Sequence, residues 1–517
     1  MSSILTNNSA MVALQTLKSI NGDLAKTQSM ISTGKEVGSA RDNSAVWAIS
    51  KVMESDVKGF KAISESLSLG SSSVAVARNG AETVTDLLVD MKEKIVAAQG
   101  ENVDRTKLQA DVNAITDQIS SVVGAAQFNG LNMLNGTDAV NVLSSLDRAS
   151  DGTVSSANIT VARQDLSTDA GVYGTGADLS ANITAADGAN SLAGVAGSQF
   201  SNAGNTMTIA LAATTAGASN TYNLQVAGET VTFTSAATGN TATSIADGIT
   251  AALNAAGIEG ISATAATGTI TLTSLSKFDD VEVNFSTTDG TATANVNGGG
   301  AGGAGAGFTG ETIAARASTL TFSTTAGVAE GDGYRASIGG VNYDYVAGPG
   351  ETFEDVARGL KTVIDGAGID NISTNVKQDE NTGAWILQID NDSATDLALT
   401  DAGAAGGTAT GGLVGLDNLD VTSDAGVAAA LANIETYIDT TIDAAAEFGS
   451  SQGRIDTQAE FISNLTDNLK SGIGALVDAD MEEASARLQA LQVQQQLGVQ
   501  SLSIANQAPQ TILSLFR

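Results

Sequence analysis

The sequence predicts an α+β protein: an elongated, multi-domain chain whose helical ends pack together as a coiled-coil or bundle rod, with β-rich outer domains inserted between them. Three observations support this prediction. Apolar residues recur three, four or seven positions apart in residues 1–140 and 424–517, as in packed helices. Residues 141–430 differ in composition, with a net charge of −23 and most of the glycine, threonine and aromatic residues. This middle region also contains an internal repeat.

The N-terminal region predicts three helices. Leu17, Leu24 and Ile31 are seven residues apart, with Leu14 beside them, which is typical of a supercoiled helix. A second, proline-free run extends from about residue 43 to about residue 99. A helix of that length would be roughly 80 Å long and belongs to a rod. A break at residues 100–102 precedes a third helix, expected over residues 104–127.

The C-terminal region repeats this pattern. Ser423 or Asp424 is expected to cap a helix that extends beyond Ile473. A final helix follows Asp478-Ala479-Asp480. Neither end can bury its apolar stripe alone, so we expect the two ends to pack on each other and to leave residues 141–430 as an insertion.

The middle region predicts strands and short helices arranged as two copies of one unit. Residues 222–274 and 334–390 share a pattern of hairpin, amphipathic helix and hairpin at an offset of about 112 positions. Gly298–Gly307 contains only glycine and alanine, which predicts a flexible connection between the copies.

Composition excludes several functions. The net charge of −33 argues against binding nucleic acid or an anionic membrane through charge. The chain has no histidine and no cysteine, which excludes imidazole triads, zinc proteases of the H-E-x-x-H type and cysteine nucleophiles. No apolar run is long enough for membrane insertion, and residues 1–17 lack the basic and apolar segments of a signal peptide. We therefore expect no enzyme activity and no cofactor.

Two acidic clusters could in principle supply oxygen ligands to Ca²⁺. They are Asp390, Asn391, Asp392 and Asp396, and Asp279, Asp280 and Glu282. Neither has the glycine turn and bidentate glutamate of an EF-hand loop, so both are expected to be solvated acidic loops without metal. A carboxylate-pair glycosidase stays open, but no pair stands out.

Short motifs at both ends resemble bacterial flagellin. In the first half they are residues 4–8, residues 33–50, Phe128-Asn129-Gly130 and Met133-Leu134. In the second half they are Phe448-Gly449, Gln452, Arg454-Ile455, Asn464-Leu465, Asn468-Leu469, Asp478-Ala479-Asp480, residues 505–510 and Ile512-Leu513. The sequence departs from the family at Glu36, Gly38, Val46 and Ala475, which puts the family's salt bridges near the bend between the inner domains in doubt.

The resemblance implies a structural subunit that polymerises into the helical flagellar filament for swimming. It implies further copies of the chain, hook-associated junction and cap proteins, an export chaperone and the flagellar type III export apparatus as partners. It also implies an extracellular location reached without a cleaved signal peptide. The alternatives are a hook–filament junction protein, a surface adhesin and a flagellin with an inserted enzyme.

The expected domains are residues 1–40 with 478–517 as the filament core, 41–140 with 424–477 as the helical rod, 141–199 as a β-hairpin and connection, and 200–297 and 308–410 as two outer β/α domains. The expected filament-core packing residues are Leu14, Leu17, Leu24, Ile31, Leu488, Leu491, Leu502 and Ile504. The residues matched to family motifs are Gly34, Ser39, Ala40, Asp42, Phe128, Asn129, Gly130, Arg454, Asp478, Asp480, Asn506, Gln507 and Pro509.

The resemblance also bears on recognition by the vertebrate innate receptor for flagellin. Members that activate the receptor carry Arg, Leu and Gln where this chain has Asp90, Lys94 and Ala97. The resemblance therefore implies that the receptor recognises this chain poorly.

Overall fold

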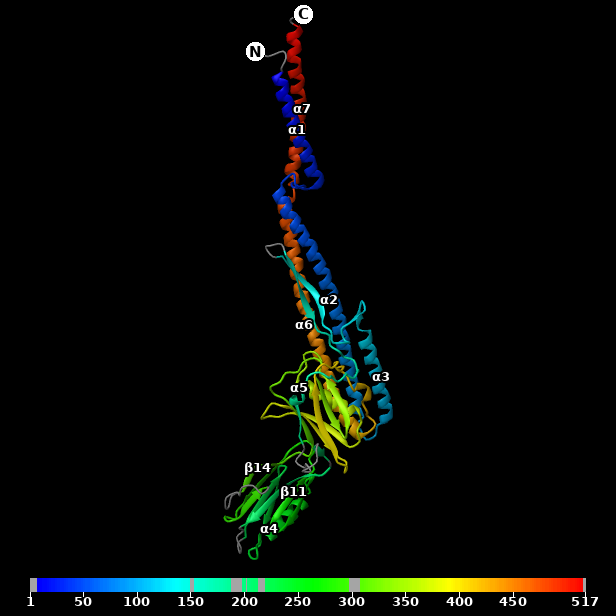
Figure 1. The fold of residues 1–517 in the computed structure, drawn as a ribbon, viewed down its shortest axis with the longest axis vertical. Coiled ribbons are helices and arrows are strands. Elements are labelled where there is room, and N and C mark those ends of the chain that lie inside the picture. Colours follow the sequence, from blue (N-terminus) through cyan, green and yellow to red (C-terminus); the bar gives the residue numbers. More distant parts are fainter. Residues whose placement is uncertain are drawn as a thin grey trace. The chain divides into compact units, whose positions relative to one another are not determined.

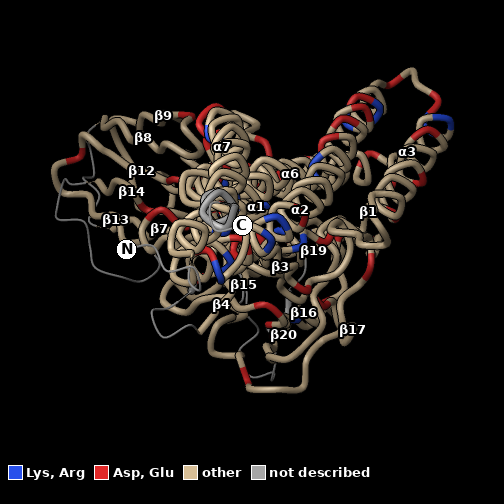
Figure 2. Tube along the Cα trace, turned by 90° about the horizontal axis from the view of Figure 1, so that it is seen from above, with Lys and Arg blue, Asp and Glu red and all other residues tan. Residues whose placement is uncertain are grey.

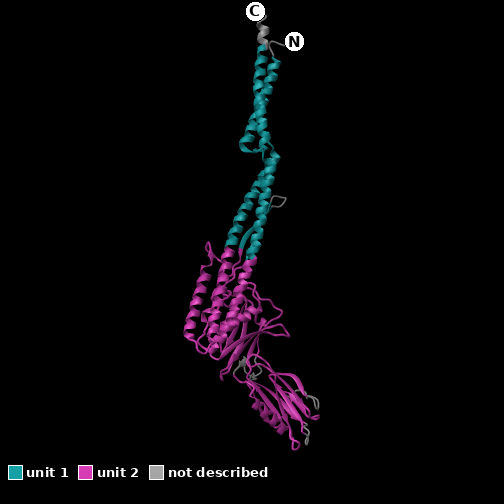
Figure 3. Ribbon diagram, turned by 180° about the vertical axis from the view of Figure 1, so that it is seen from behind, with its two compact units in different colours: residues 1–72, 141–161, 451–517 teal, residues 73–140, 162–450 magenta. Residues whose placement is uncertain are grey.

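A computed structural model describes residues 7–148, 153–186, 198–200, 202–212, 219–296 and 307–514. The chain divides into two compact units, unit 1 with residues 1–72, 141–161 and 451–517, and unit 2 with residues 73–140 and 162–450 (Figure 3). The expected Gly298–Gly307 connection, apart from Gly307, lies outside the described residues, as do residues 4–6.

In unit 1, two helices from opposite ends of the sequence lie side by side. They are α1 (Asn8–Thr33) and α7 (Met481–Ser514), and Figure 1 shows them in blue and red. They run antiparallel, because the Asn7 side chain donates to the carbonyl of Ala505 and Gln495 donates to Asn21. Asn7 also caps α1 by accepting from the backbone N–H of Ala10. The predicted packing of the two ends of the chain on each other is therefore confirmed.

Two helices of 54 residues each span both units: α2 (Ser44–Ala97) and α6 (Asp424–Val477). In unit 1 a hairpin of β3 (Val140–Arg148) and β4 (Val154–Val161) also packs against these helices. Ser71 of α2 donates to Asp456 of α6, and Gln458 of α6 donates to the carbonyl of Ser144 in β3. The hairpin lies against α2 where a glycine permits it, since a Cβ on Gly70 would be 2.6 Å from a methyl group of Val142.

In unit 2, α2 and α6 continue beside α3 (Arg105–Ala125), which Asp104 caps. Thr85 donates to Thr441, and Lys92 forms an ion pair with Glu435 at 2.5 Å, so α2 and α6 remain in contact. A buried apolar stripe extends along α2 from Val74 to Ile95. The predicted helices at both ends agree with the structure to within about two residues at each boundary.

Unit 2 also contains two β-rich modules. The first, called the inserted module, consists of β7 (Asn205–Ala212), β8 (Thr221–Val226), β9 (Glu229–Thr234), α4 (Ala242–Ala256), β10 (Ile261–Ala266), β11 (Thr269–Ser274), β12 (Val281–Thr287), β13 (Thr293–Val296) and β14 (Phe308–Ile313). The second, called the host module, consists of β5 (Ile183–Ala186), β6 (Ser198–Phe200), β15 (Ser318–Phe322), β16 (Gly333–Ile338), β17 (Val341–Val346), α5 (Phe353–Gly366), β18 (Ile372–Gln378), β19 (Trp385–Asn391) and β20 (Leu397–Ala404).

The predicted repeat is confirmed, because each module has a hairpin, a helix and a second hairpin in that order. Each module folds into two four-stranded antiparallel sheets. In the inserted module their strand orders are β10-β11-β7-β13 and β14-β12-β8-β9; in the host module they are β18-β19-β15-β5 and β17-β16-β20-β6. The two hairpins of a repeat therefore lie in different sheets, with the helix between them in sequence. A Thr–x–x–Ser or Thr–x–x–Asp capping box begins each helix.

The modules differ in where their last two strands come from. In the inserted module β13 and β14 follow the repeat, whereas in the host module the equivalent strands β5 and β6 precede it. The inserted module thus interrupts the host module between β6 and β15, as a permuted copy placed inside another. The expected domain limits at residues 199 and 308 differ from this arrangement. Hydrogen bonding places β14 with the first copy and places β5 and β6 with the second, and neither strand pairing is visible in local sequence.

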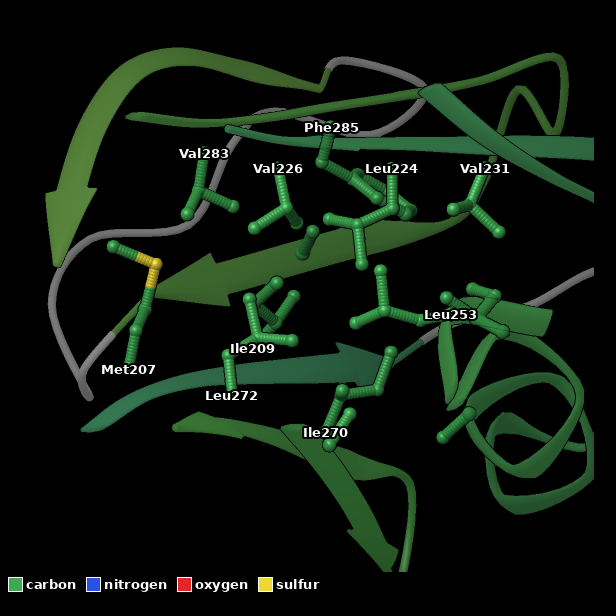
Figure 4. Packing of buried hydrophobic residues seen from close by; sticks show 14 of the residues in the cluster. Met207, Ile209, Leu224, Val226, Val231, Leu253, Ile270, Leu272, Val283 and Phe285 are labelled. Carbon is green, nitrogen blue, oxygen red and sulfur yellow. The ribbon is translucent and has the colours of Figure 1, made fainter. Parts of the chain in front are cut away.

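Each module has its own apolar core. In the inserted module, Ile209, Leu224 and Phe285 from both sheets converge on Leu253 of α4 (Figure 4). The strands alternate buried and exposed residues, as in β7, because one face of each sheet meets this core. The host module has a separate core that includes Tyr334, Leu360 and Leu387.

Candidate assembly surface

The α1–α7 pair uses some of the predicted core-packing residues within the chain. Leu17, Leu24 and Ile31 of α1 are half-buried, as are Leu488 and Leu502 of α7, and Leu491 is 7% exposed. A Cβ on Gly498 of α7 would lie 3.2 Å from Leu17, so the backbones approach closely at that point.

The other predicted packing residues face away from this contact. Leu14 is 58% exposed and Ile504 is 68% exposed. Apart from Met481 at the first residue of α7, the further exposed apolar residues among the described side chains of the two helices are Met11, Val12, Val493, Leu497 and Val499. This set, including Leu14 and Ile504, is called the exposed apolar set. Seven large apolar side chains on two solvent-facing helices exceed the scatter expected on a monomer surface and are typical of an interaction surface.

In unit 1, the segment that follows α1 and the segment between α6 and α7 are hydrogen-bonded to each other. The backbone N–H of Ala479 donates to Gly34, and that of Glu36 donates to Val477 at 2.7 Å. Lys35 and Asp478 form a β-bridge. Gly34 has a φ of 69°, a left-handed conformation that ends α1 and that a glycine adopts without strain.

Acidic motif residues organise the turns on both sides of this joint. The Asp42 carboxylate accepts from the backbone N–H and the hydroxyl of Ser39, each at 2.9 Å. These hydrogen bonds hold the pKa of Asp42 below its ordinary value. Asp480 accepts from the backbone N–H of Glu482 at 2.9 Å and so caps α7. Ala40, which lies between Ser39 and Asp42 in the sequence, is exposed.

The Phe128-Asn129-Gly130 motif forms a tight hairpin turn. Phe128 of β1 (Gln127–Phe128) pairs with Leu131 of β2 (Leu131–Asn132) across it. Asn129 and Gly130 have φ values of 51° and 82°, the pattern that favours Asn-Gly in two-residue turns.

The remaining motif residues lie on helix surfaces. Arg454 is exposed on α6, and Asn506 and Gln507 are exposed on α7. Pro509 lies within the range of α7, and its side chain is outside the described part of the chain.

The three positions implicated in receptor recognition lie on one stretch of α2. Asp90 and Ala97 are exposed. The Lys94 side chain is 37% exposed, and its Nζ lies 3.8 Å from the Glu93 carboxylate. Val89 and Val96, beside them, are also exposed.

The expectation that Asp390 belongs to a solvated acidic loop is wrong. Asp390 is fully buried at the end of β19, and Arg316 binds both of its carboxylate oxygens, at 2.7 and 2.6 Å. Asp392 is partly exposed and pairs with Arg316 and Lys277. Sequence reasoning missed this cluster, although a signal existed: Lys277 and Arg316 are the only basic residues between positions 164 and 334.

The other acidic cluster is exposed, as expected, and Asp280 accepts from the backbone N–H of Ala315 at 2.8 Å. Among the described residues, no group of three or more carboxylates is arranged to hold a metal ion. No described helix has the length and apolarity needed to cross a membrane.

A polar cavity of about 860 Å³ lies between α5, α6 and the segments near residues 165 and 410. Its lining includes Glu351, whose carboxylate accepts from the hydroxyl of Tyr345 at 3.0 Å. Burial, together with the neighbouring charge of Asp355, raises the pKa of Glu351 to about 7. Seven of the lining residues are acidic and only Arg358 is basic.

Basic residues are concentrated in the helical ends of the sequence. Red acidic positions occur throughout the trace in Figure 2, whereas 16 of the 24 basic residues belong to residues 1–140 and 431–517.

Paired helical ends with exposed apolar side chains, and acidic β modules inserted between them, define a class: structural subunits that assemble through their termini. Comparison with known proteins identifies the family within this class. Residues 4–139 match the bacterial flagellin N-terminal helical region, and residues 431–516 match the C-terminal helical region. The chain belongs to the bacterial flagellin family, and it is a structural subunit of the flagellar filament.

The similarity to curated relatives extends over the whole chain. Flagellin A of Rhizobium meliloti is 30% identical over 522 residues, with all of both chains covered. Flagellin FljN of Caulobacter vibrioides is 39% identical over 142 residues, covering 27% of this chain and 52% of FljN. Among solved structures, a flagellar hook-associated protein-3 from Legionella pneumophila aligns with 82% of this chain and over 98% of its own length. The sequence identity is 9% and the TM-score is 0.32, which is too low to indicate a shared fold.

Proposed function

We propose that the chain polymerises through the exposed apolar set on α1 and α7, while the half-buried residues of these helices hold the pair together within each subunit. The observation that carries this proposal is the exposure of Leu14 and Ile504 beside Val12, Leu497 and Val499. Burying these side chains between subunits removes apolar surface from water, at roughly 25 cal/mol per Å².

Membership of the flagellin family implies the finer features of this proposed function. The inserted and host modules face outward, where their acidic charge is solvated. The chain leaves the cell unfolded through the flagellar type III export apparatus, with an export chaperone and without a cleaved signal peptide. It then meets the hook-associated junction and cap proteins outside the cell. The role is mechanical, and no catalytic step is assigned to any residue.

The test is assembly of purified monomer, followed by negative-stain imaging and sedimentation. Val12→Asp and Leu497→Asp place a charge in the exposed apolar set and should abolish filaments while leaving far-UV circular dichroism unchanged. Gln500→Asp, an exposed polar position on the same helix, is the matched control and should assemble normally. Filaments formed by both apolar-set variants would contradict the proposal.

A cellular experiment separates the filament role from the alternatives. Deleting the gene should abolish swimming, and the protein should be present in thousands of copies per cell. A deletion strain that swims normally would favour an adhesin, and an abundance of only a ring's worth of copies would favour a junction protein.

A further inference from the structure

The inserted module has an unusual charge distribution. Residues 205–313 contain eight acidic residues and a single basic one, Lys277. Arg316 follows in the connection between β14 and β15, where the chain returns to the host module. Both cations are directed at the same two host aspartates, Asp390 and Asp392, so every basic group of this stretch is used at one place.

Arg316 lies at the centre of this joint. Its side chain is 5% exposed, and its guanidinium contacts both oxygens of Asp390 and, at 2.5 Å, Asp392. It also donates to the carbonyl of Asn202, in the connection that enters the inserted module, at 3.3 Å. One side chain therefore ties the incoming and outgoing connections to β19 of the host module.

Further polar contacts surround it. The backbone N–H groups of Arg316 and Ala317 donate to Ser276 and Lys277. Gln388 of the host module donates to the carbonyl of Phe278 at 2.9 Å. Bidentate and multiply hydrogen-bonded contacts of this kind define an angle as well as a distance. The two apolar cores are separate, so the joint is polar rather than a continuation of either core.

We propose that this charged joint is an orientation lock. Lys277 and Arg316 hold the inserted module at one angle to the host module, and neutralising the joint releases the inserted module to swivel as an intact folded body. Replacing both partners of a buried ion pair together is often neutral for stability, which is why release without unfolding is expected. The proposal does not depend on how the helical ends assemble.

The test uses the full-length monomer and spin-label distances. Because the chain has no cysteine, Ala255→Cys in α4 and Glu380→Cys in the β18–β19 turn provide the only two labelling sites, both exposed. Double electron–electron resonance should give one narrow distance distribution. Lys277→Gln combined with Asp392→Asn should at least double its width, while circular dichroism stays unchanged. Both substituted groups are 41% exposed, so neither change leaves a buried charge without a partner.

A second variant protects the test against misfolding. Arg316→Met with Asp390→Leu removes both charges of the buried pair together and should broaden the distribution by at least the same factor. Asp344→Asn breaks a comparable bidentate pair with Arg335 inside one sheet and is the matched control. A broad distribution before any change, no broadening in either joint variant, or equal broadening in the control would each overturn the proposal.

Discussion

Gly359 of α5 lies directly against the ring of Tyr345 in β17: a Cβ at position 359 would be 2.2 Å from a ring carbon. The inserted module has the same relationship between Gly248 of α4 and Phe233 of β9, also at 2.2 Å. In both modules a helix glycine makes room for an aromatic residue of the first hairpin. The repeat therefore preserves a packing contact as well as an order of elements.

Gly359→Ala should destabilise the host module. The added methyl group must displace a buried ring, and this strain exceeds the gain in helix propensity, for a net loss of about 2 kcal/mol. In a Trp47→Phe background, Trp385 of β19 is the only tryptophan, so its fluorescence during urea unfolding reports on the host module. Gly366→Ala in the same helix is the control, because its Cβ would meet only ordinary contacts at 3.5 Å. Equal stability of the two variants would contradict the packing argument.

The host module should lose stability as the pH rises towards neutrality. The pKa of Glu351 is raised from 4.5 to about 7 in the folded state, so between these values the unfolded chain has released its proton and the folded chain retains it. The contribution of Glu351 to stability is greatest below pH 4.5, falls to about pH 7 and is then constant, with a loss of about 2 kcal/mol after allowance for partial exposure.

Glu351→Gln should flatten this dependence in the Trp385 fluorescence assay, because a neutral amide retains the hydrogen bond with Tyr345 at every pH. Glu354→Gln, in the first turn of α5, is the control and should leave the slope in place. A slope unchanged by Glu351→Gln would assign the effect to another group.

Removing the inserted module should leave a folded host module and a chain that assembles. Arg316 donates to the carbonyl of Asn202, so residues 203–315 can be replaced by a short Gly-Ser-Gly link. Trp385 emission and filament formation should both be retained. A wider deletion of residues 200–410 should also leave assembly intact, but it removes β15 and leaves β5 without its partner. Loss of filaments from a folded 203–315 deletion would show that the inserted module carries subunit contacts.

Trimming either terminus should abolish polymerisation. Removing residues 1–40 exposes the face of α7 that α1 covers. Removing residues 478–517 exposes the face of α1 that α7 covers. Most of the stability of a helix in a protein comes from packing of its apolar face, so neither helix is expected to form an assembly-competent surface without its partner. The trimmed chains should stay monomeric in sedimentation.

In the full-length monomer, proteases should cut the two termini before they cut the rest of the chain. Termini that resist proteases in the monomer would contradict this prediction.

The vertebrate innate receptor should respond weakly to this chain. Asp90 reverses the charge of the arginine in responsive relatives, and Lys94 and Ala97 replace an apolar and a hydrogen-bonding contact. The combined loss is about 2 kcal/mol, or roughly thirtyfold in affinity. Asp90→Arg with Lys94→Leu and Ala97→Gln should restore potency in a reporter-cell assay of purified monomer. Unchanged potency of the triple variant would reject the idea.

Local periodicity predicted the long helices and the repeated units, because the patterns of helices and hairpins depend on residues that are close together in the sequence. Charge pairing over long separations could not be predicted in the same way. Asp390 belongs to a run of acidic residues, and only the fold brings Arg316, 74 positions away, onto it. The pairing of β5 with β15 is similarly distant. Exposure of Leu14 beside half-buried Leu17 depends on which face of α1 meets α7, which the seven-residue spacing does not specify.

The placement of one module inside another also bears on how the chain reaches its native state. Ile183 in β5 must meet Phe322 in β15, although the two residues are 139 positions apart along the chain. Once the inserted module has folded, its two ends are adjacent, because the side chain of Asn205 donates to the carbonyls of Ala314 and Ala315 at 2.8 Å. The loop that β5 and β15 close is then short, and the entropy lost on closing it is correspondingly small. Folding of the inserted module before the host module therefore lowers the entropic cost of completing the host sheets.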